Sequence, residues 1–291
     1  MKKRILVTGV NSYIGNAFRA YMEQYTDEAV VEGVSVRNDT WKTLDFSAFD
    51  CVFDVAGIAH ADTGHISEEE KNRYYAVNCD LTVALAKKAK QDGVKQFIFM
   101  SSAIVYGDSA PIGLNRVITR DTDPAPADFY GDSKLQAEKG ILPLADEHFR
   151  IAVLRPPMIY GKDSKGNYPV LSKMAQKLPV FPKVENCRSM LYIGNLVEFV
   201  RLIIKNEEEG FFFPQNGQYS NTSQLVQMIA EAHGKRIVLL GGCTVPLRIL
   251  SQATGLVNKA FGSLAYDMSM SDYKENYRRF SLEESIRLTE G

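Results

Sequence analysis

The sequence predicts an α/β fold in which a doubly wound parallel sheet is joined to a smaller C-terminal lobe. Short apolar runs alternate with helical patterns, a glycine-containing turn follows the first run, and a Tyr-x-x-x-Lys motif opens a later helix. Strands that alternate with helices favour a parallel sheet covered on both faces. The runs expected to form strands are Ile5–Val7, Val30–Val36, Cys51–Val55, Phe97–Met100, Ile151–Leu154 and Phe211–Phe213.

The composition is that of an ordinary globular protein. The 291 residues are 45% hydrophobic and 24% charged, with a net charge of −1. A net charge near zero gives no overall positive field that would attract nucleic acid or an anionic membrane, so small ligands are the expected partners. No run reaches the ~20 apolar residues of a membrane span. The four cysteines lack metal-ligand spacing and are expected to be reduced, which predicts a cytoplasmic protein without a metal site.

The first turn, Thr8–Gly15, lies between a strand and a helix. Gly9 permits a tight turn, and Gly15 lets the helix pack on the strand with its first N–H groups directed at a pyrophosphate. An ordinary glycine-rich turn is the alternative, and the features downstream favour dinucleotide binding. The residues between the two glycines that are expected beside the ligand are Asn11, Ser12, Tyr13 and Ile14.

The end of the second strand, Gly33–Arg37, bears on the choice of dinucleotide. An acidic side chain at such a strand end binds the ribose hydroxyls of NAD, whereas an arginine suits the 2′-phosphate of NADP. Arg37 therefore permits NADP, but it could equally stack on adenine or face solvent. The cofactor prediction stays open between NAD and NADP.

Two serines, Ser101 and Ser102, end the strand Phe97–Met100. Their hydroxyls are expected at the carboxyl edge of the sheet, where ligands bind in such folds. A hydroxyl at this edge can hold a substrate oxygen. The alternative is that the serines only cap the strand.

Tyr130 and Lys134 lie four residues apart on a helix whose expected N-cap is Asp128, so they share one helix face. A free tyrosine has a pKa near ~10. The Lys134 ammonium and the helix dipole are expected to lower the pKa of Tyr130, which would make the phenol a usable acid or base. The alternative is a plain surface helix turn.

At these residues the chain resembles the extended short-chain dehydrogenases/reductases, in the branch of nucleotide-sugar epimerases and dehydratases. The catalytic Ser, Tyr and Lys of that family fall on Ser102, Tyr130 and Lys134. Ser12 stands where the family pattern T-G-x-x-G-x-x-G has its middle glycine, and a negative φ would let Ser12 serve there. The resemblance implies a Rossmann-type fold that binds NAD or NADP.

Further site residues are implied by the same resemblance. Asp45 and Phe46 resemble the pair at the adenine ring, and Asn78 falls where the family keeps an Asn that braces the catalytic strand. The other implied cofactor positions are Val55, Ala56, Gly57, Ser101 and Pro156. The implied substrate positions, besides Ser102 and Tyr130, are His60, Ala103, Asn167 and Arg188. For His60, an exposed loop histidine is the alternative.

The positions after Ser102 indicate the class of reaction. Dehydratases of the family carry an acid and a base where this chain has Ala103 and Ile104, so the resemblance implies hydride exchange without elimination. The expected activity is that of a UDP-sugar 4-epimerase acting at carbon 4. The alternatives are an NAD(P)H-dependent reductase of a UDP-4-keto-6-deoxy-sugar and a non-catalytic NAD(P)-sensing protein.

The resemblance also predicts domains and assembly. Residues 1–157 and 190–220 are expected to bind NAD(P), and residues 158–189 and 221–291 to bind the nucleotide sugar. A helix from Glu68 to Lys90 and the Tyr130 helix are expected to form a homodimer. Later elements predicted from the sequence are helices at Val170–Lys177, Leu225–Ala232 and Pro246–Leu256, a strand at Ile237–Leu240 and a terminal helix begun by Ser281.

Overall fold

The computed structural model describes residues 2–59, 67–253 and 255–291, and its contacts divide the chain into two compact units. The first unit comprises Met1–Gly107, Pro124–Pro156 and Val197–Phe213, and the second comprises Asp108–Asp123, Pro157–Leu196 and Pro214–Gly291. The second unit thus contains 108–123, 157, 190–196 and 214–220, which the expected boundaries assigned to the NAD(P)-binding part.

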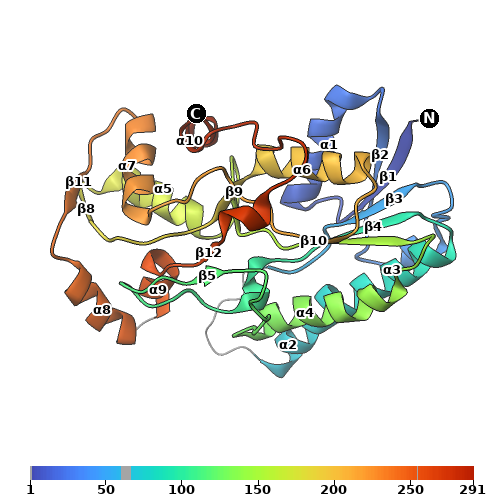
Figure 1. Cartoon of the computed structure of the whole chain (residues 1–291), viewed down its shortest axis with the longest axis horizontal. Helices are drawn as coiled ribbons and strands as arrows, with labels where there is room; N and C mark the ends of the chain where they lie inside the picture. Colours follow the sequence, from blue (N-terminus) through green and yellow to red (C-terminus); the bar gives the residue numbers. More distant parts are fainter. Residues whose placement is uncertain (1, 60–66, 254) are drawn as a thin grey trace. The chain divides into compact units, whose positions relative to one another are not determined.

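The first unit is built on a parallel sheet, as the sequence predicts (Figure 1). The strand order is β10-β6-β4-β3-β1-β2, and every neighbouring pair is parallel. Each predicted strand is present within about two residues of its expected bounds. The strands are β1 (Lys3–Thr8), β2 (Ala29–Val34), β3 (Cys51–Asp54), β4 (Gln96–Met100), β6 (Arg150–Leu154) and β10 (Gly210–Phe212).

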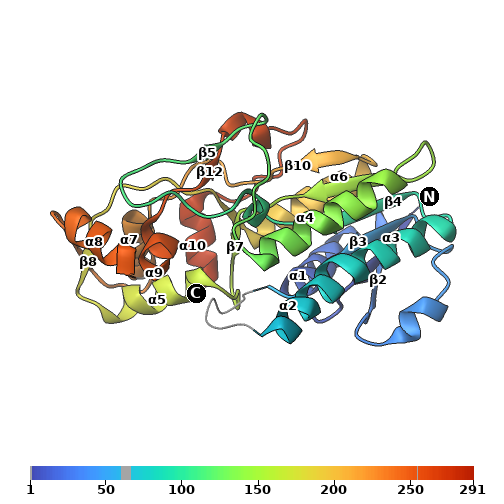
Figure 2. The same cartoon turned by 90° about the horizontal axis from the view of Figure 1, so that it is seen from below.

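Helices cover both faces of this sheet (Figures 1 and 2). The helices are α1 (Tyr13–Met22) and α6 (Ile193–Lys205) on one face, and α2 (Glu68–Tyr75), α3 (Leu81–Gln91) and α4 (Phe129–Ile141) on the other. Phe18 of α1 packs edge-on against Phe53 of β3, with ring centroids 5.2 Å apart. On the opposite face, Leu85 and Ala137 are fully buried against Phe97. A sheet buried on both faces explains why its strands read as continuous apolar runs.

The predicted helix Glu68–Lys90 is present but is not uniformly α-helical. A π-helical segment, Ala76–Asp80, separates α2 from α3. Such segments are rare and occur frequently at functional sites. This one carries the predicted site residue Asn78.

The chain order of the strands locates the ligand-binding edge of the sheet. The chain passes from β1 to β2 on one side and then crosses to β3 on the other side, so the topological switch point lies between β1 and β3. Ligands of open parallel sheets bind beyond the carboxyl ends of the strands at such a point. Here those ends are Thr8 and Asp54.

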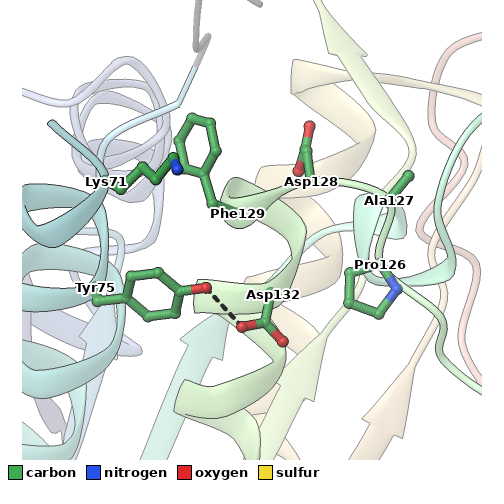
Figure 3. A pocket seen from close by; sticks show the side chains of 7 residues that line it. All are labelled: Lys71, Tyr75, Pro126, Ala127, Asp128, Phe129 and Asp132. Carbon is green, nitrogen blue, oxygen red and sulfur yellow. Dashed lines mark hydrogen bonds between the residues drawn. The ribbon is translucent and has the colours of Figure 1, made fainter. Parts of the chain in front are cut away.

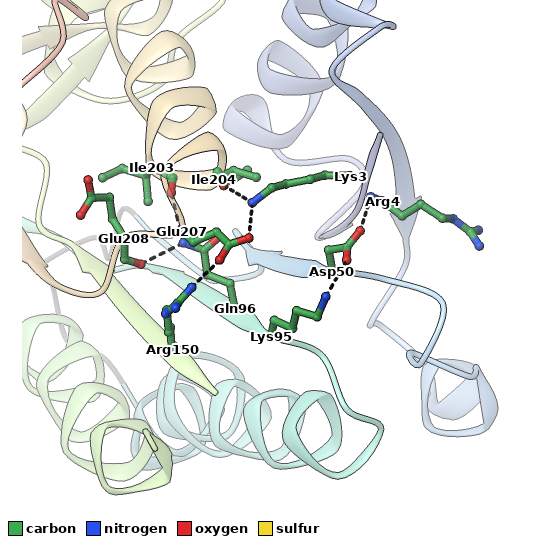
Figure 4. A network of polar contacts seen from close by, with 10 residues as sticks. All are labelled: Lys3, Arg4, Asp50, Lys95, Gln96, Arg150, Ile203, Ile204, Glu207 and Glu208. Atoms are coloured by element: carbon green, nitrogen blue, oxygen red, sulfur yellow. Dashed lines mark hydrogen bonds and ion pairs between the residues drawn. The ribbon is translucent and has the colours of Figure 1, made fainter. Parts of the chain in front are cut away.

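The amino edge of the sheet is closed by polar contacts with the C-terminal end of α6 (Figure 4). Lys3 Nζ donates to the Ile204 carbonyl at 2.8 Å and pairs with Glu207 at 2.9 Å. The buried Gln96 amide donates to the Ile203 and Glu208 carbonyls at 3.2 and 2.9 Å. These bonds satisfy backbone carbonyls that the helix end leaves without partners in its own helix. The carboxyl edge is therefore the one that can accept a ligand.

The second unit packs helices around three short parallel strand pairs. The pairs are β5 (Val117–Ile118) with β12 (Ala265–Tyr266), β7 (Met158–Tyr160) with β9 (Met190–Tyr192), and β8 (Val180–Pro182) with β11 (Val238–Leu240). The helices are α5 (Asn167–Lys177), α7 (Thr222–Ala232), α8 (Thr244–Ala253), α9 (Gly255–Phe261) and α10 (Leu282–Glu290). Tyr160 and Tyr168 stack in its core, 5.1 Å apart. The predicted N-cap is confirmed, because the Ser281 side chain accepts from the Glu284 N–H.

Candidate functional site

The glycine turn lies directly on the backbone that follows β3. Gly9 has φ +69°, and a Cβ added to it would lie 3.0 Å from both Cα and N of Ala56. A Cβ on Gly15 would lie 2.7 Å from Ser12 Oγ and 3.1 Å from Val55 Cγ2. Both positions therefore require glycine, the first for its backbone conformation and both for space.

Ser12 has the negative φ that its place in the turn requires, with φ −76° and ψ 150°. Its Oγ accepts a hydrogen bond from Gly15 N at 3.0 Å and so caps α1. Because the oxygen is the acceptor in this bond, the hydroxyl proton can still be donated to a ligand oxygen. Ser12 thus replaces a glycine without distorting the turn.

Asp54 is a site residue that sequence reasoning missed. Its carboxylate is fully buried at the end of β3. It accepts from Thr8 Oγ1 at 2.5 Å, Thr82 Oγ1 at 3.0 Å and Ala56 N at 3.1 Å. Burial raises the pKa of Asp54, and these hydrogen bonds and Lys134 oppose the rise. The available signal was a single acidic residue inside the apolar run Cys51–Gly57.

The structure brings Ser102 and Tyr130 close together. Ser102 follows β4 in an extended conformation, and its side chain lies close enough to the Tyr130 phenol to favour the phenolate. Tyr130 occupies the first turn of α4, where Asp128 accepts from Gly131 N at 2.7 Å as the predicted N-cap. Lys134 lies one turn further on, and its Nζ donates to the Met100 carbonyl at 3.0 Å.

The expected lowering of the Tyr130 pKa is not found in the chain alone. Burial raises the pKa of Tyr130 to about 12, although the nearby Ser102 side chain opposes this rise. Burial also lowers the pKa of Lys134 to about 8, against the opposing carboxylates of Asp54 and Glu138. The prediction was wrong because it left out desolvation, which outweighs the helix dipole when the phenol is buried. In addition, Nζ is directed at Met100 O and lies 4.7 Å from the centre of the Phe99 ring.

Asn78 braces a different segment from the one expected. Its Oδ1 accepts from Ile58 N at 2.8 Å, and its Nδ2 donates to Ile58 O and Ser133 Oγ, each at 3.1 Å. Asn78 therefore ties the loop after β3 to α4 rather than to β4. A Cβ on Gly57 would lie 3.1 Å from Asn78 Oδ1 and 3.2 Å from Lys134 Nζ, so this glycine leaves room beside the amine.

Asp45 and Phe46 do not reach the carboxyl edge. The Phe46 ring is fully buried in the core, and Phe46 N donates to Asp92 Oδ2 at 3.0 Å. Asp92 ends α3 just before β4 begins, which places it at the amino edge of the sheet. Only four residues separate Phe46 from the start of β3. So short a segment keeps Phe46 at the edge where β3 begins. This position does not fit the expected place of Asp45 and Phe46 beside the adenine ring.

The remaining predicted residues take various positions. Arg37 is exposed just beyond β2, and the buried Pro156 accepts from Ala103 N at 2.9 Å. Asn167 and Arg188 belong to the second unit, where Asn167 is exposed and Arg188 Nη1 donates to the Lys259 carbonyl at 2.6 Å. His60 lies outside the described residues.

A buried ion pair that the sequence analysis did not identify supports the Ser102–Lys134 region. Arg155 Nε and Nη2 donate to the two carboxylate oxygens of Glu138 at 3.0 and 2.5 Å. Arg155 Nη1 donates to the Tyr106 hydroxyl at 2.7 Å, and Ser101 donates to Glu138. The Ser101 hydroxyl is therefore used within the protein, which argues against its expected place beside the cofactor. The network joins the ends of β4 and β6 to α4.

A shallow pocket of about 470 Å³ lies between α2 and the start of α4 (Figure 3). Tyr75 donates to Asp132 Oδ2 across it at 2.7 Å. Its lining comprises Lys71, Tyr75, Pro126, Ala127, Asp128, Phe129 and Asp132, and it contains none of Ser102, Tyr130 and Lys134. The pocket is thus separate from the candidate site.

Within the described part of the chain, no helix combines the length and the apolar character needed to cross a bilayer. Among the same residues, no group of three or more His, Cys, Asp or Glu side chains is placed to hold a metal ion.

Comparison with known proteins gives consistent matches. Residues 5–212 match the model of the NAD dependent epimerase/dehydratase family. A UDP-glucose 4-epimerase of Vibrio cholerae is 28% identical over 292 residues, covering 92% of this chain and 88% of the relative. The N-acetyl-alpha-D-glucosaminyl-diphospho-ditrans,octacis-undecaprenol 4-epimerase of Escherichia coli O157:H7 is 32% identical over 199 residues, covering 62% and 58%. A dTDP-4-dehydrorhamnose reductase structure from Clostridium acetobutylicum superimposes with a TM-score of 0.73 at 16% identity, covering 98% of each chain.

Proposed function

The chain belongs to the NAD dependent epimerase/dehydratase family and is an NAD(P)-dependent enzyme, and we propose that it is a UDP-sugar 4-epimerase acting at carbon 4. The observation that carries the proposal is that the Ser102 side chain lies beside the Tyr130 phenol, with Lys134 one helix turn further on. These residues follow β4 and begin α4, at the same sheet edge as the glycine turn. A phenol that can exchange a proton and a hydroxyl that can hold an oxygen are the groups that oxidation of a sugar alcohol requires.

The glycine turn and the Lys134 region fit a dinucleotide. Gly9 packs on Ala56, and Gly57 leaves space beside Lys134 Nζ that any side chain would fill. The dinucleotide supplies the hydride acceptor and donor when it is bound. The residues proposed to hold it are Gly9, Asn11, Ser12, Tyr13, Ile14, Gly15, Arg37, Val55, Ala56, Gly57, Asn78, Tyr130, Lys134 and Pro156. Arg37 leaves the choice of NAD or NADP open.

In the proposed reaction, Tyr130 takes the proton from the sugar hydroxyl and later returns it. Ser102 holds the same oxygen, and Lys134 is proposed to hold the dinucleotide beside Tyr130. Ala103 and Ile104 have no group that transfers protons, so the site does not support elimination of water. The second unit is proposed to bind the sugar nucleotide through Asn167 and Arg188. We also propose a cytoplasmic homodimer formed by α2, α3 and α4.

A 4-ketoreductase is the second candidate, because the fold also superimposes on that of a sugar-nucleotide reductase. A reductase consumes NAD(P)H in proportion to product, whereas an epimerase turns over with no net consumption. With a panel of UDP-sugars, the protein should therefore give epimerised product without a change in absorbance at the reduced-cofactor band. With NAD(P)H and UDP-4-keto-6-deoxy-sugars, it should leave that absorbance unchanged. Stoichiometric loss of NAD(P)H would overturn the epimerase proposal. The panel should include a lipid-linked sugar diphosphate, because a diphosphate is common to the substrates named for the two epimerase relatives.

The affinity for the dinucleotide is expected to fall as the pH rises through about 8. Lys134 has a pKa of about 8 in the folded chain. Below that pH it is an ammonium that attracts the negatively charged dinucleotide, and above it the charge is lost. Titrations of NAD and NADP at pH 6.5 to 9.5, followed by tyrosine and tryptophan fluorescence, check this. Lys134→Met should bind more weakly at pH 7 and lose the dependence near pH 8. An unchanged pH profile in the variant would contradict the assignment.

A further inference from the structure

The second unit has an apolar strand face exposed to solvent. In the β8/β11 pair, Val180 lies opposite Val238, and Pro182 lies opposite Leu240. Alternate residues of a strand point to opposite faces, and Phe181 between them is buried. The other face therefore presents Val180, Val238 and Leu240, all of which are exposed.

Helix α8 follows this strand pair in the chain, after the turn Gly241–Cys243 (Figure 1), and carries further exposed apolar side chains. Val245 and Ile249 are four residues apart on one helix face and are 66% and 65% exposed. Leu250 beside them is 50% exposed. We call the residues Val180, Val238, Leu240, Val245, Ile249 and Leu250 the α8 surface. Grouped exposed apolar side chains mark interaction sites, whereas single exposed apolar side chains are normal on protein surfaces.

The chain segment that carries β11 and α8 contains basic residues and no acidic ones. No Asp or Glu occurs from residue 232 to residue 266, whereas this stretch contains Lys235, Arg236, Arg248 and Lys259. Lys235, Arg236 and Arg248 are exposed. The net charge of −1 for the whole chain conceals this local excess. Exposed aliphatic side chains with basic neighbours are the combination that binds anionic lipid headgroups and their acyl boundary.

We propose that the α8 surface docks the protein on an anionic membrane surface. The aliphatic side chains enter the headgroup boundary, and the basic side chains lie among the lipid phosphates. A second copy of the chain is a poorer occupant, because a two-fold contact would bring the same basic stretch against itself. The proposal does not depend on the proposed reaction, because vesicle binding is measured without substrate.

Sedimentation of the full chain with vesicles tests the proposal. Vesicles of phosphatidylethanolamine and phosphatidylglycerol (3:1) should bind it, and phosphatidylcholine vesicles should bind it at least about tenfold more weakly. Binding should also weaken in 0.5 M salt, since surface charges are then screened. Equal binding to both vesicle types, or to neither, would overturn the proposal.

Three variants locate the contact. Lys235→Gln with Arg236→Gln should lower the partition by about fivefold per basic residue. Val245→Ser with Ile249→Ser should lower the partition at least about tenfold, because the variant has two fewer apolar side chains to transfer from water into the membrane interface. Val30→Ser, at an exposed position on β2 in the first unit, is the matched control and should bind like the parent. Thermal melts and turnover of soluble UDP-sugar should be the same for all three.

Two outcomes would refute the assignment of this surface. If Val30→Ser reduces vesicle binding as much as the α8 variants do, the effect is not specific to this region. If Val245→Ser with Ile249→Ser instead converts a dimer to a monomer in light scattering and leaves lipid binding unchanged, the surface is a contact between copies.

Discussion

Tyr130→Phe is expected to lower turnover by about 10³-fold while the affinity for the dinucleotide stays within about twofold. The substitution removes only the hydroxyl that lies beside Ser102 and that exchanges the proton of the sugar in the proposed reaction. General acid–base groups contribute about 10² to 10⁴ in rate. The ring is retained, including its edge contact with Tyr74 at 6.2 Å, so folding should be unaffected. Steady-state kinetics and a fluorescence titration with NAD(P) provide the two measurements.

Tyr75→Phe is the matched control for this experiment. Tyr75 also has a pKa raised to about 12 by burial, and its hydroxyl donates to Asp132 at 2.7 Å. Loss of this hydroxyl costs one hydrogen bond outside the Ser102–Tyr130 pair. Turnover should therefore remain close to that of the parent. Similar losses in both variants, or full activity of Tyr130→Phe, would remove Tyr130 from the mechanism.

The elevated pKa of Tyr130 implies that ligand binding precedes activation of the phenol. A phenol with a pKa of about 12 is protonated at neutral pH, so the chain alone does not hold a ready base. Lys134 Nζ is directed at the Met100 carbonyl, and Asp54 and Glu138 favour its charged form. Activation of the phenol is therefore expected to require the bound dinucleotide and substrate. The chain supplies the catalytic groups and their approximate positions. Ligand binding is then expected to supply the interactions that lower the pKa of the phenol.

The parts of the structure that depend on local pattern could be predicted from the sequence. The apolar runs identify the strands because a sheet buried on both faces needs unbroken apolar side chains. Asp128 identifies the start of α4 because the first N–H groups of a helix need acceptors. The relation of Ser102 to Tyr130 follows from their positions at a strand end and a helix start. The strands and the start of α4 are set by neighbours within a few residues.

The remaining features depend on partners that are distant in sequence. Glu138 and Arg155 are 17 residues apart, and Asp54 meets Thr8 and Thr82, so no local pattern marks these contacts. The position of Phe46 depends on the length of the segment before β3, which its dipeptide motif does not encode. The pKa of Tyr130 depends on burial, which becomes known only from packing. The sequence therefore predicts where the chemistry lies better than how each group is held.

Glu138→Gln is expected to lower the free energy of unfolding by about 3–5 kcal/mol, the second large effect. Arg155 and Glu138 are 7% and 1% exposed and form a two-pronged ion pair. Removing one charge leaves the other buried without its counter-charge, which costs about that amount. Glu138 also lies one turn from Lys134 and favours its charged form. Urea unfolding followed by circular dichroism measures the loss.

The exposed pair Arg4–Glu32 provides the matched control, with 2.6 Å between Arg4 Nη2 and Glu32 Oε1. Its side chains are 45% and 46% exposed, so Glu32→Gln should cost at most about 1 kcal/mol. Replacing both buried partners, as in Glu138→Gln with Arg155→Met, should recover part of the lost stability because no unpaired charge remains. If Glu138→Gln costs no more than Glu32→Gln, the buried pair does not hold α4 against β6. A double variant less stable than Glu138→Gln would show that Arg155 instead stabilises the fold through Tyr106 and the Phe211 ring, whose centre lies 4.4 Å from its guanidinium carbon.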